Sequence, residues 1–388
     1  MANLCDYVMW RGDIPFTVRP FNAIDALVLC QLAYVNFFGI IPDRFDAGIT
    51  LQDAARCYAK NPKRGSEFGA FINPLSADLL ADAAETERFG TIILKGFVNE
   101  IDRCTGKQFA AITAVLPSGN LCVVYRGTDD TIIGWKEDFL LCLPDPIPSH
   151  TASVHYLSAA AKAQSGTLYV AGHSKGGNLA LYAAGTVGIP VQKRIERVFC
   201  FDGPGFAFDI ERQSRFQTII PKIRSFIPQS SIVGVLLCYF PHYSVIESNE
   251  SNIFWQHDTF SWQIKRDHFV TYEKGRSKES CFAEKTMQTW LSHLDVQERR
   301  KFIETLFEIM FSTGAETVSE LTANGLSHSV NMLKELHSVD SKRKKELFTV
   351  IKFFFEAAYT HFPLGKQSIK SKNTDEGLPS ASETAHSR

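Results

Sequence analysis

The spacing of apolar residues divides the 388-residue chain into three regions. Before residue 90, apolar positions recur at helical spacing and predict helices at 25–38, 50–60 and 75–88, after an irregular start at 1–20. From there to about residue 260, short apolar runs alternate with helical stretches, as strands and helices do in α/β proteins. Helical spacing then returns, and the helices expected in this last region cover 280–294, 296–313, 317–336 and 341–361.

Strands that alternate with helices through 120–260 predict a largely parallel sheet that is covered on both faces. We therefore predict an α/β protein. It is expected to contain a helical N-terminal segment that packs on the core, the α/β core itself, a helical C-terminal extension and a disordered polar tail. These parts are expected at 1–89, 90–274, 275–365 and 366–388.

The region 167–185, TLYVAGHSKGGNLALYAAG, combines a strand, a sharp turn and a helix. An apolar run at 168–171 is typical of a strand, the turn is G-H-S-K-G-G, and small and apolar residues continue as a helix. A G-x-S-x-G turn in this setting indicates a nucleophile elbow with Ser174 at its apex. A glycine-rich turn with an incidental serine is the alternative interpretation.

Sterics and electrostatics both favour a reactive serine at this turn. A side chain at Gly172 or Gly176 would collide with the strand or the helix, and Gly177 lets the helix pack closely. The helix begins directly behind Ser174, so its free N–H groups and the positive end of its dipole point at the reaction centre. Ser174 is therefore the predicted nucleophile.

A serine hydroxyl needs a base to take its proton and an acid to orient that base. Asp202 is the predicted acid, because it ends the strand after the elbow helix and a Gly-Pro-Gly turn follows it. A turn aspartate that bonds its own backbone is the alternative. The place after the next strand holds the uncharged residues 229–231. Asp258 is a weaker rival because it adjoins the candidate histidine.

His257 is the predicted base, because it follows the last expected strand of the core and completes the order serine, acid, histidine. The other downstream histidines fit less well. His242 follows a proline in a loop, His268 lies among charged residues and His293 falls in the helical extension. A structural histidine is the alternative interpretation of His257.

The oxyanion of a tetrahedral intermediate needs two N–H donors. One expected donor is the amide of Lys175, directly after the nucleophile. The turn Arg126-Gly127-Thr128, after an earlier strand, offers the amide and the hydroxyl of Thr128, with a plain turn as the alternative. Four charged residues are expected to form an ion-pair cluster that supports this turn: Arg126, Asp129, Glu137 and Asp138.

Composition and charge narrow the class of protein. A formal net charge of −1 gives no global field that would attract nucleic acid. Nine cysteines, an odd number without a C-x-x-C pair, indicate reduced, mostly buried thiols in a cytoplasmic protein rather than a disulfide framework or a zinc site. The charged start does not predict a signal peptide, and the longest apolar run, 231–240, is too short to span a bilayer. We expect no metal and no cofactor.

Several segments of the chain resemble a known family. VVYRGTDDTIIGWKEDF is similar to the F-R-G-[ST]…W…D segment of the class 3 (fungal-type) lipases, and AGHSKGGNLA is similar to their G-H-S-L-G-G-A-L-A elbow. YRGTDDTIIGWKEDF, FDGPGF, SSIVG, QHDTFSW and the helical start resemble more closely a bacterial family of uncharacterised α/β-hydrolase-like proteins related to those lipases. The resemblance covers about residues 5–270. It implies an α/β-hydrolase fold, with Ser174 as nucleophile, His257 as base and the amides of Thr128 and Lys175 as oxyanion hole.

Two positions depart from the lipase pattern. Lys175 stands where those lipases have leucine. Their acid follows the strand that ends here near Pro228, where this chain has Gln229 and Ser230. Asp202 lies one strand earlier, which resembles the placement of the acid in the pancreatic lipase family.

The expected function is lipase- or esterase-like hydrolysis of a small-molecule or lipid carboxylic ester, through an acyl-enzyme on Ser174 and without a cofactor. A thioesterase or an amidase would use the same triad. A non-catalytic α/β-hydrolase scaffold that binds a ligand or a protein partner is the alternative of a different class. The missing acid at the usual lipase position favours that alternative, and the intact G-H-S-K-G-G, R-G-T and His257 disfavour it.

Two apolar segments have roles that the sequence leaves open. The phenylalanine-rich stretch 348–362 is the most apolar part of the extension, and a core position is expected there ahead of membrane contact. The extension itself is a cap, a dimer surface or a lipid-contacting element, so peripheral contact with a membrane and the oligomeric state both stay open. The run 231–240 is either a lid over an acyl pocket or a buried segment.

Overall fold

The computed structural model of the chain describes residues 2–61, 65, 68–69, 72–323, 336 and 339–361. The tail expected at 366–388 and most of the second half of the helix expected at 317–336 lie outside the described residues. No helix within the described ranges has both the length and the hydropathy needed to cross a membrane.

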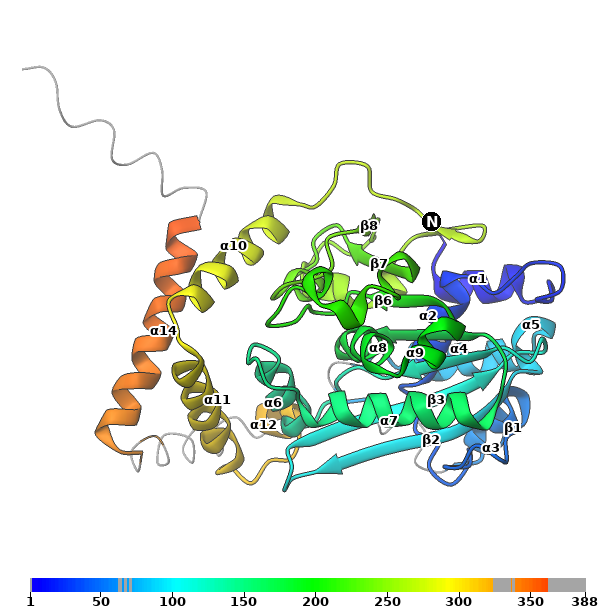
Figure 1. Ribbon diagram of the computed structural model, residues 1–388, viewed down its shortest axis with the longest axis horizontal. Helices are drawn as coiled ribbons and strands as arrows, with labels where there is room; N and C mark the ends of the chain where they lie inside the picture. Colours follow the sequence, from blue (N-terminus) through cyan, green and yellow to red (C-terminus); the bar gives the residue numbers. More distant parts are fainter. Residues whose placement is uncertain are drawn as a thin grey trace, which may run out of the picture.

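An eight-stranded sheet forms the centre of the molecule, with its strands in chain order from β1 to β8 (Figure 1). The strands from β1 to β4 pair antiparallel, and those from β4 to β8 pair parallel, so the predicted mostly parallel sheet is confirmed. The strands are β1 (Ile49–Thr50), β2 (Ile93–Asp102), β3 (Lys107–Val115), β4 (Leu121–Tyr125), β5 (Leu168–His173), β6 (Ile195–Phe201), β7 (Ile223–Pro228) and β8 (Tyr243–Ile246). A separate hairpin consists of β9 (Ile264–Lys265) and β10 (His268–Phe269).

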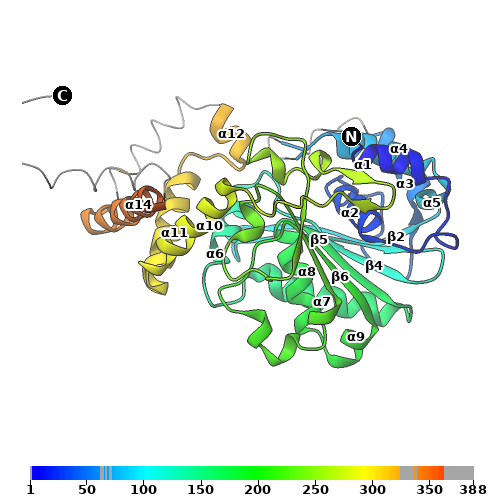
Figure 2. The ribbon, with the colours of Figure 1, turned by 90° about the horizontal axis from the view of Figure 1, so that it is seen from above.

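Helices cover both faces of the sheet (Figure 2). Alternate residues of β4 show how this happens, since Cys122 and Val124 pack in one core while Val123 and Tyr125 pack in the other. The helices on the first face are α1 (Leu4–Arg11), α2 (Ala23–Leu32), α3 (Leu51–Ala59), α4 (Leu75–Ala84) and α5 (Glu87–Gly90). Those on the second face are α7 (Pro148–Ala163), α8 (Lys175–Thr186) and α9 (Ile189–Arg194). The chain therefore has an α/β-hydrolase fold.

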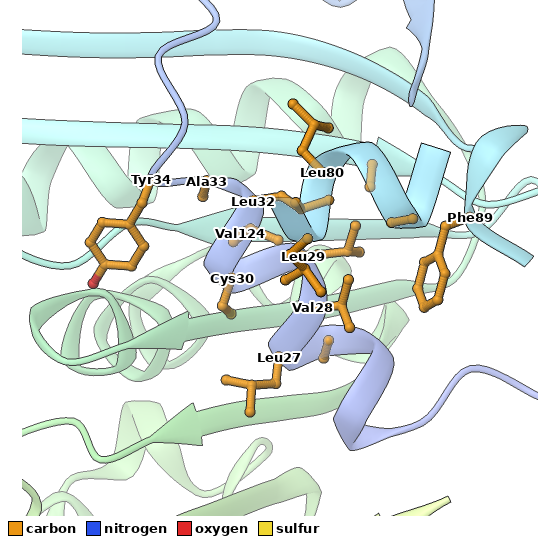
Figure 3. Packing of buried hydrophobic residues seen from close by; sticks show 14 of the residues in the cluster. Leu27, Val28, Leu29, Cys30, Leu32, Ala33, Tyr34, Leu80, Phe89 and Val124 are labelled. Atoms are coloured by element: carbon orange, nitrogen blue, oxygen red, sulfur yellow. The ribbon is translucent and has the colours of Figure 1, made fainter. Parts of the chain in front are cut away.

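The N-terminal segment packs through α2, in which nearly every residue is buried (Figure 3). An asparagine at 22 favours a cap for the helix expected at 25–38, and Asn22 does cap α2, where Asp25 completes a capping box. Arg88 reaches the buried carboxylate of Asp25, with Nη2 to Oδ2 at 2.6 Å. This pair joins α2 to α5 inside the core, where removal of one partner would leave an unpaired buried charge.

Several predicted boundaries are wrong for local reasons. The segment 1–20, expected to be irregular, contains α1, because Asn3 forms a capping box with Asp6. Helix α2 ends at Leu32 rather than near Phe38. Helix α7 begins at Pro148, because proline fits the first position of a helix. The polar stretch 210–217 forms two 3₁₀ turns, Ile210–Arg212 and Ser214–Phe216.

The C-terminal extension is helical, as predicted, and lies beside one end of the sheet (Figures 1 and 2). Helix α11 packs against α6 (Ile132–Leu140), the helix that follows β4. The ring centroids of Phe139 and Phe307 lie 5.4 Å apart in this contact. Asp295 caps α11 and forms a capping box with Glu298. The described part of the extension contains α10 (Lys278–Ser292), α11 (Val296–Phe311), α12 (Val318–Ala323) and α14 (Ser341–His361).

Candidate active site

Ser174 lies in the turn between β5 and α8, as the sequence predicts. Its φ of 57° is in the left-handed region, which is strained for a residue with a side chain. A Cβ at Gly172 would lie 2.0 Å from the Gly176 carbonyl oxygen, and one at Gly176 would lie 2.1 Å from that of Tyr125. Both glycines are therefore needed for the turn to pass between its neighbours, and Ser174 precedes the first residue of α8.

Asp202 and His257, predicted as acid and base, lie together. Asp202 follows β6, its side chain is fully buried, and its Oδ2 is 2.6 Å from His257 Nδ1. Because the carboxylate accepts this hydrogen bond, the proton of the imidazole is on Nδ1 and the lone pair is on Nε2. The other carboxylate oxygen accepts from the hydroxyl of Ser231 at 2.5 Å and from the amide of Gly234 at 3.1 Å.

Ser231 belongs to the segment in which the class 3 lipases have their acid. In the sequence, residues 229–231 are only a rival position for the acid, and none of them carries a charge. In the structure, this segment instead supplies a donor that holds the acid from the preceding strand. A Cβ at Gly234 would lie 2.3 Å from Asp202 Oδ1, so the glycine leaves room for the carboxylate. Asp258, the weaker rival, instead accepts from Asn73 at 2.6 Å.

Ser174 and His257 line the same cavity, which has a volume of about 550 Å³. Among the contacts of the described residues, no hydrogen bond joins the Ser174 hydroxyl to His257. Catalytic hydrogen bonds are often long in ligand-free proteins and tighten when a substrate binds. Two of the predicted residues, Ser174 and His257, are thus brought to one cavity. The buried Asp202 contacts His257, whereas the contact between His257 and Ser174 is open.

Gly127 brings the predicted oxyanion turn against the elbow. A Cβ at this position would lie 3.0 Å from Ser174 Cβ, so the next residue, Thr128, is close to the nucleophile. The Thr128 hydroxyl donates to Asp138 Oδ2 at 2.6 Å and is not free for an oxyanion, which leaves the amide. Burial raises the pKa of Asp138 to about 6, although Lys175 opposes this shift.

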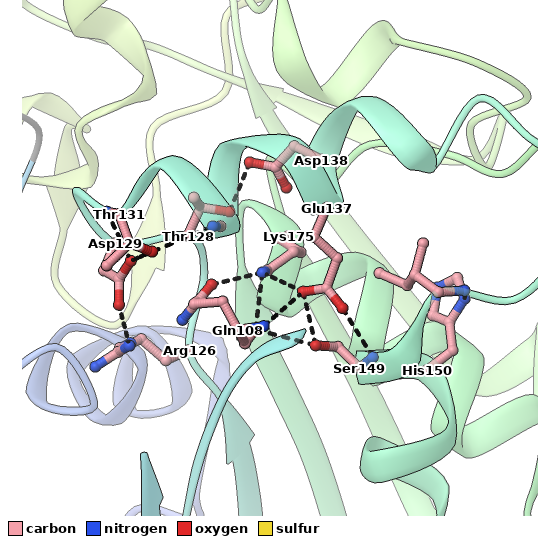
Figure 4. Close-up of polar contacts among 12 residues, drawn as sticks. Gln108, Arg126, Thr128, Asp129, Thr131, Glu137, Asp138, Ser149, His150 and Lys175 are labelled. Carbon is pink, nitrogen blue, oxygen red and sulfur yellow. Dashed lines mark hydrogen bonds and ion pairs between the residues drawn. The ribbon is translucent and has the colours of Figure 1, made fainter. Parts of the chain in front are cut away.

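The Lys175 side chain is buried in an ion pair below the turn (Figure 4). Its Nζ lies 2.8 Å from Glu137 Oε2 and 2.9 Å from the carbonyl oxygen of Gln108. Glu137 also accepts from the amide and the hydroxyl of Ser149. Lys175 therefore links α8 to α6, β3 and α7 at the position where the class 3 lipases have leucine.

The single ion-pair cluster predicted around the oxyanion turn is wrong. Arg126 does pair with Asp129 at 2.8 Å, and Asp129 in turn accepts from Thr131. Glu137, however, pairs with Lys175, and Asp138 accepts from Thr128. The four residues form three separate contacts, because adjacent residues of α6 point in different directions.

A hydrogen-bonded chain that the sequence does not predict joins the N-terminal segment to the base. His173 Nε2 lies 2.9 Å from the backbone oxygen of His257, which can only accept, so this nitrogen carries the proton. Burial lowers the pKa of His173 well below its usual value and keeps the ring neutral. Its Nδ1 therefore accepts from the Tyr34 hydroxyl at 3.1 Å.

The sequence signal for this contact is the histidine of the G-H-S motif, although nothing in the sequence identifies Tyr34 as its partner.

The described residues also bear on metal binding and on the state of the cysteines. In the part of the chain that the structure describes, no group of three or more histidine, cysteine, aspartate or glutamate side chains could hold a metal ion. All nine cysteines are free thiols, but only Cys30, Cys122 and Cys200 are buried, so the expectation that most of these thiols are buried is wrong.

The fold and the elbow define a protein of the α/β-hydrolase class, with a serine and a histidine at one cavity and a buried aspartate bonded to that histidine. More specifically, the chain belongs to the Mbeg1-like family, whose model matches residues 83–308. A search of curated proteins finds no match.

Two solved lipase structures are similar to the chain at a low level. The crystal structure of M37 lipase shares 12% identity at a TM-score of 0.35 and covers 64% of this chain and 84% of its own. The Rhizomucor miehei lipase in its native propeptide complex shares 17% identity at a TM-score of 0.30, and covers 51% and 67%. Because these scores are low, the assignment of the fold rests on the strand order and the elbow.

Proposed function

We propose that the protein is a serine hydrolase that cleaves carboxylic esters through an acyl-enzyme on Ser174. The observation that carries this proposal is the 2.6 Å contact between His257 Nδ1 and Asp202 Oδ2, at a cavity that Ser174 also lines. A base that is oriented by a buried carboxylate, beside a serine on a strained turn, is suited to acyl transfer.

In the proposed reaction, His257 Nε2 takes the proton of Ser174 Oγ as this oxygen attacks the ester carbonyl carbon. The amides of Thr128 and Lys175 receive the negative charge that develops on the carbonyl oxygen. His257 then gives the proton to the leaving alcohol, and the acyl group stays on Ser174. Water, deprotonated by His257, attacks the acyl carbon. His257 then returns the proton to Ser174 Oγ as the bond from Oγ to the acyl carbon breaks and the carboxylic acid leaves. These steps need no cofactor.

Labelling of the purified protein with a fluorophosphonate tests the proposal directly. We expect a covalent adduct at Ser174, found by peptide mapping, and no adduct in Ser174→Ala or His257→Ala. Turnover of a p-nitrophenyl ester should fall in Ser174→Ala to background, a loss of up to about a millionfold in a fully active enzyme. The urea midpoint should change little, because within the described residues the hydroxyl makes no hydrogen bond to His257 that would be lost. Unchanged turnover in Ser174→Ala would contradict the proposal.

Thioesters and amides are the closest alternative substrates, because the same three residues can cleave them. A series with one acyl group and an ester, a thioester or an anilide leaving group distinguishes these activities. We expect the highest kcat/KM with the ester.

One observation favours a second candidate function, a non-catalytic scaffold that binds an apolar ligand. The Ser174 hydroxyl and His257 make no hydrogen bond to each other within the described residues. If the folded protein takes up no fluorophosphonate and hydrolyses none of the three substrates, this second function replaces the first.

A further inference from the structure

The cavity at Ser174 extends to the C-terminal extension. Residues of the core line one part of it, including Ser174 and His257. Helices α10 and α11 line another part, so the extension forms a wall of the site. The apolar residues of this wall are Met287, Trp290, Leu291, Phe302 and Ile303, together with Leu294 between the two helices, and Arg299 of α11 also lines it.

The polar groups near this wall are already bonded to backbone carbonyls. Trp290 Nε1 donates to the oxygen of Val350 at 2.9 Å. The three nitrogens of the Arg299 side chain donate to the oxygens of Leu294, Cys142 and Leu291 at 3.2, 3.1 and 2.6 Å. The wall therefore presents mainly apolar surface to the cavity, and a polar ligand group would lose its hydrogen bonds to water there.

Polar atoms are found at the other part of the cavity, where Ser174, His257 and Asp138 lie. A ligand that fits both parts has one polar group and one apolar chain. The volume of about 550 Å³ is in the range of pockets that enclose most of a small ligand.

We propose that α10 and α11 form the acyl-chain site, and that the substrate is an ester of a medium- or long-chain unbranched fatty acid. This inference rests on the proposed function, because it assumes that the ester carbonyl binds at Ser174. Burial of the acyl chain against α10 and α11 would favour binding more strongly with each added CH₂ group. The extension then sets the preferred chain length.

Direct contacts fix the wall both to α6 and to the loop that holds Asp202. Arg299 of α11 bonds Cys142, just beyond α6, and Phe307 packs on Phe139 of α6, the helix that follows Thr128. At the start of α10, the Ser280 hydroxyl donates to the backbone oxygen of Ser231 at 2.6 Å. The same Ser231 holds the acid through its hydroxyl. The distance from wall to nucleophile is thus fixed by direct contacts.

Leu291 is the best position at which to test this site. It lines the cavity, is only partly buried and belongs to neither hydrophobic core of the extension, so Leu291→Trp fills the cavity with little disturbance of packing. We expect the ratio of kcat/KM for p-nitrophenyl dodecanoate to that for the acetate to fall about tenfold or more. Lys285→Trp adds the same bulk at an exposed position of α10 outside the cavity, and its ratio should match the wild type.

A binding measurement separates the acyl site from catalysis. In Ser174→Ala, a fluorescent dodecanoate analogue should bind, and adding Leu291→Trp should raise its Kd about tenfold. Binding that is indifferent to Leu291→Trp, or equal losses for dodecanoate and acetate, would overturn the acyl site. A loss that instead follows the chain length of the alcohol, in a series of acetate esters, would also overturn it. Binding that Leu291→Trp weakens, in a protein without any turnover or labelling, supports the site and rejects the hydrolase function.

Discussion

Asp202 adopts a conformation that few residues tolerate, and this conformation places its carboxylate. Its φ is 47°, in the left-handed region, and its amide donates to Phe226 of the neighbouring strand β7 at 2.8 Å. Aspartate and asparagine are the side chains that adopt this region most readily. The carboxylate points to the loop after β7, where Ser231 and Gly234 donate to one oxygen and leave the other for His257. An acid one strand earlier than in class 3 lipases can therefore orient the base.

Asp202→Asn keeps the backbone geometry but changes the imidazole that it orients. Because Ser231 and Gly234 both donate to Oδ1, the oxygen of the asparagine stays at that position and its amide nitrogen faces His257. This nitrogen cannot accept from Nδ1–H, so His257 no longer keeps its proton there and loses the free lone pair on Nε2. We expect kcat for a p-nitrophenyl ester to fall by about 10,000-fold, as when a triad aspartate is replaced in a serine protease. Ser231→Ala removes one of the two donors to Oδ1 and should lower kcat about tenfold, which corresponds to about 1.4 kcal/mol.

Ser230→Ala is the matched control for Ser231→Ala. The Ser230 hydroxyl donates to Ser277 at 3.0 Å rather than to the acid, so this substitution should leave kcat near the wild-type value. Equal losses in the two serine variants would show that the loop acts through its fold. A fully active Asp202→Asn would remove Asp202 from the mechanism.

Helix α2 and the loop after it show what the sequence predicts well and what it does not. The Asn22 cap and the apolar faces of the helix are local features, and both are confirmed. The partner of Tyr34 is His173, which lies 139 residues away, and no local pattern encodes that contact. The same reason explains why Ser174 was predicted from its turn, whereas the ion pair of Lys175 with Glu137 was not.

Tyr34→Phe tests whether the N-terminal segment positions the base. Without the Tyr34 hydroxyl, His173 Nδ1 loses its donor, and the ring can place its proton there instead of donating to the carbonyl of His257. We expect kcat to fall about tenfold with little change in KM, and the free energy of unfolding to fall by about 1–2 kcal/mol.

Tyr7→Phe separates this effect from a simple loss of stability. The Tyr7 hydroxyl donates to the buried carboxylate of Asp25 at 2.8 Å, within the N-terminal segment and away from the cavity. This variant should lose a similar free energy of unfolding while its kcat stays unchanged. Comparable losses of kcat in Tyr7→Phe and Tyr34→Phe would mean that the hydroxyl of Tyr34 acts only through folding.

Helices on the two faces of the sheet support different parts of the candidate active site. The first face carries the N-terminal helices and Tyr34, and the second carries α7 and α8, with His150 between them. His150 Nδ1 accepts from the amide of Ile147 at 3.2 Å, so its Nε2–H donates to Asn178 Oδ1 at 2.7 Å. Asn178 in turn donates to the oxygens of Pro204 and Gly205, in the turn that follows Asp202. A neutral buried imidazole thus supports the loop of the acid from the far side of the sheet.

The dependence of stability on pH should report this imidazole. The pKa of His150 is lowered to about 4. Burial is the main cause and the charges of Arg215 and Lys175 add to it, whereas the Asn178 hydrogen bond and Glu137 oppose the shift. The unfolded chain binds a proton near pH 6.5, so between about 6.5 and 4 it holds more protons than the folded state, and unfolding becomes easier as the pH falls. His150 alone should remove about 3 kcal/mol from the free energy of unfolding across this interval.

His150→Gln isolates that contribution. Glutamine can accept from Ile147 and donate to Asn178, but it does not titrate. Urea unfolding of both proteins from pH 7.5 down to about pH 4.5 should show a smaller free energy for the variant at neutral pH and a flatter dependence on pH below 6.5. The two curves should converge as the pH falls, because the wild type progressively loses the advantage of its neutral imidazole. Parallel curves would show that other groups, such as His173, carry the whole dependence.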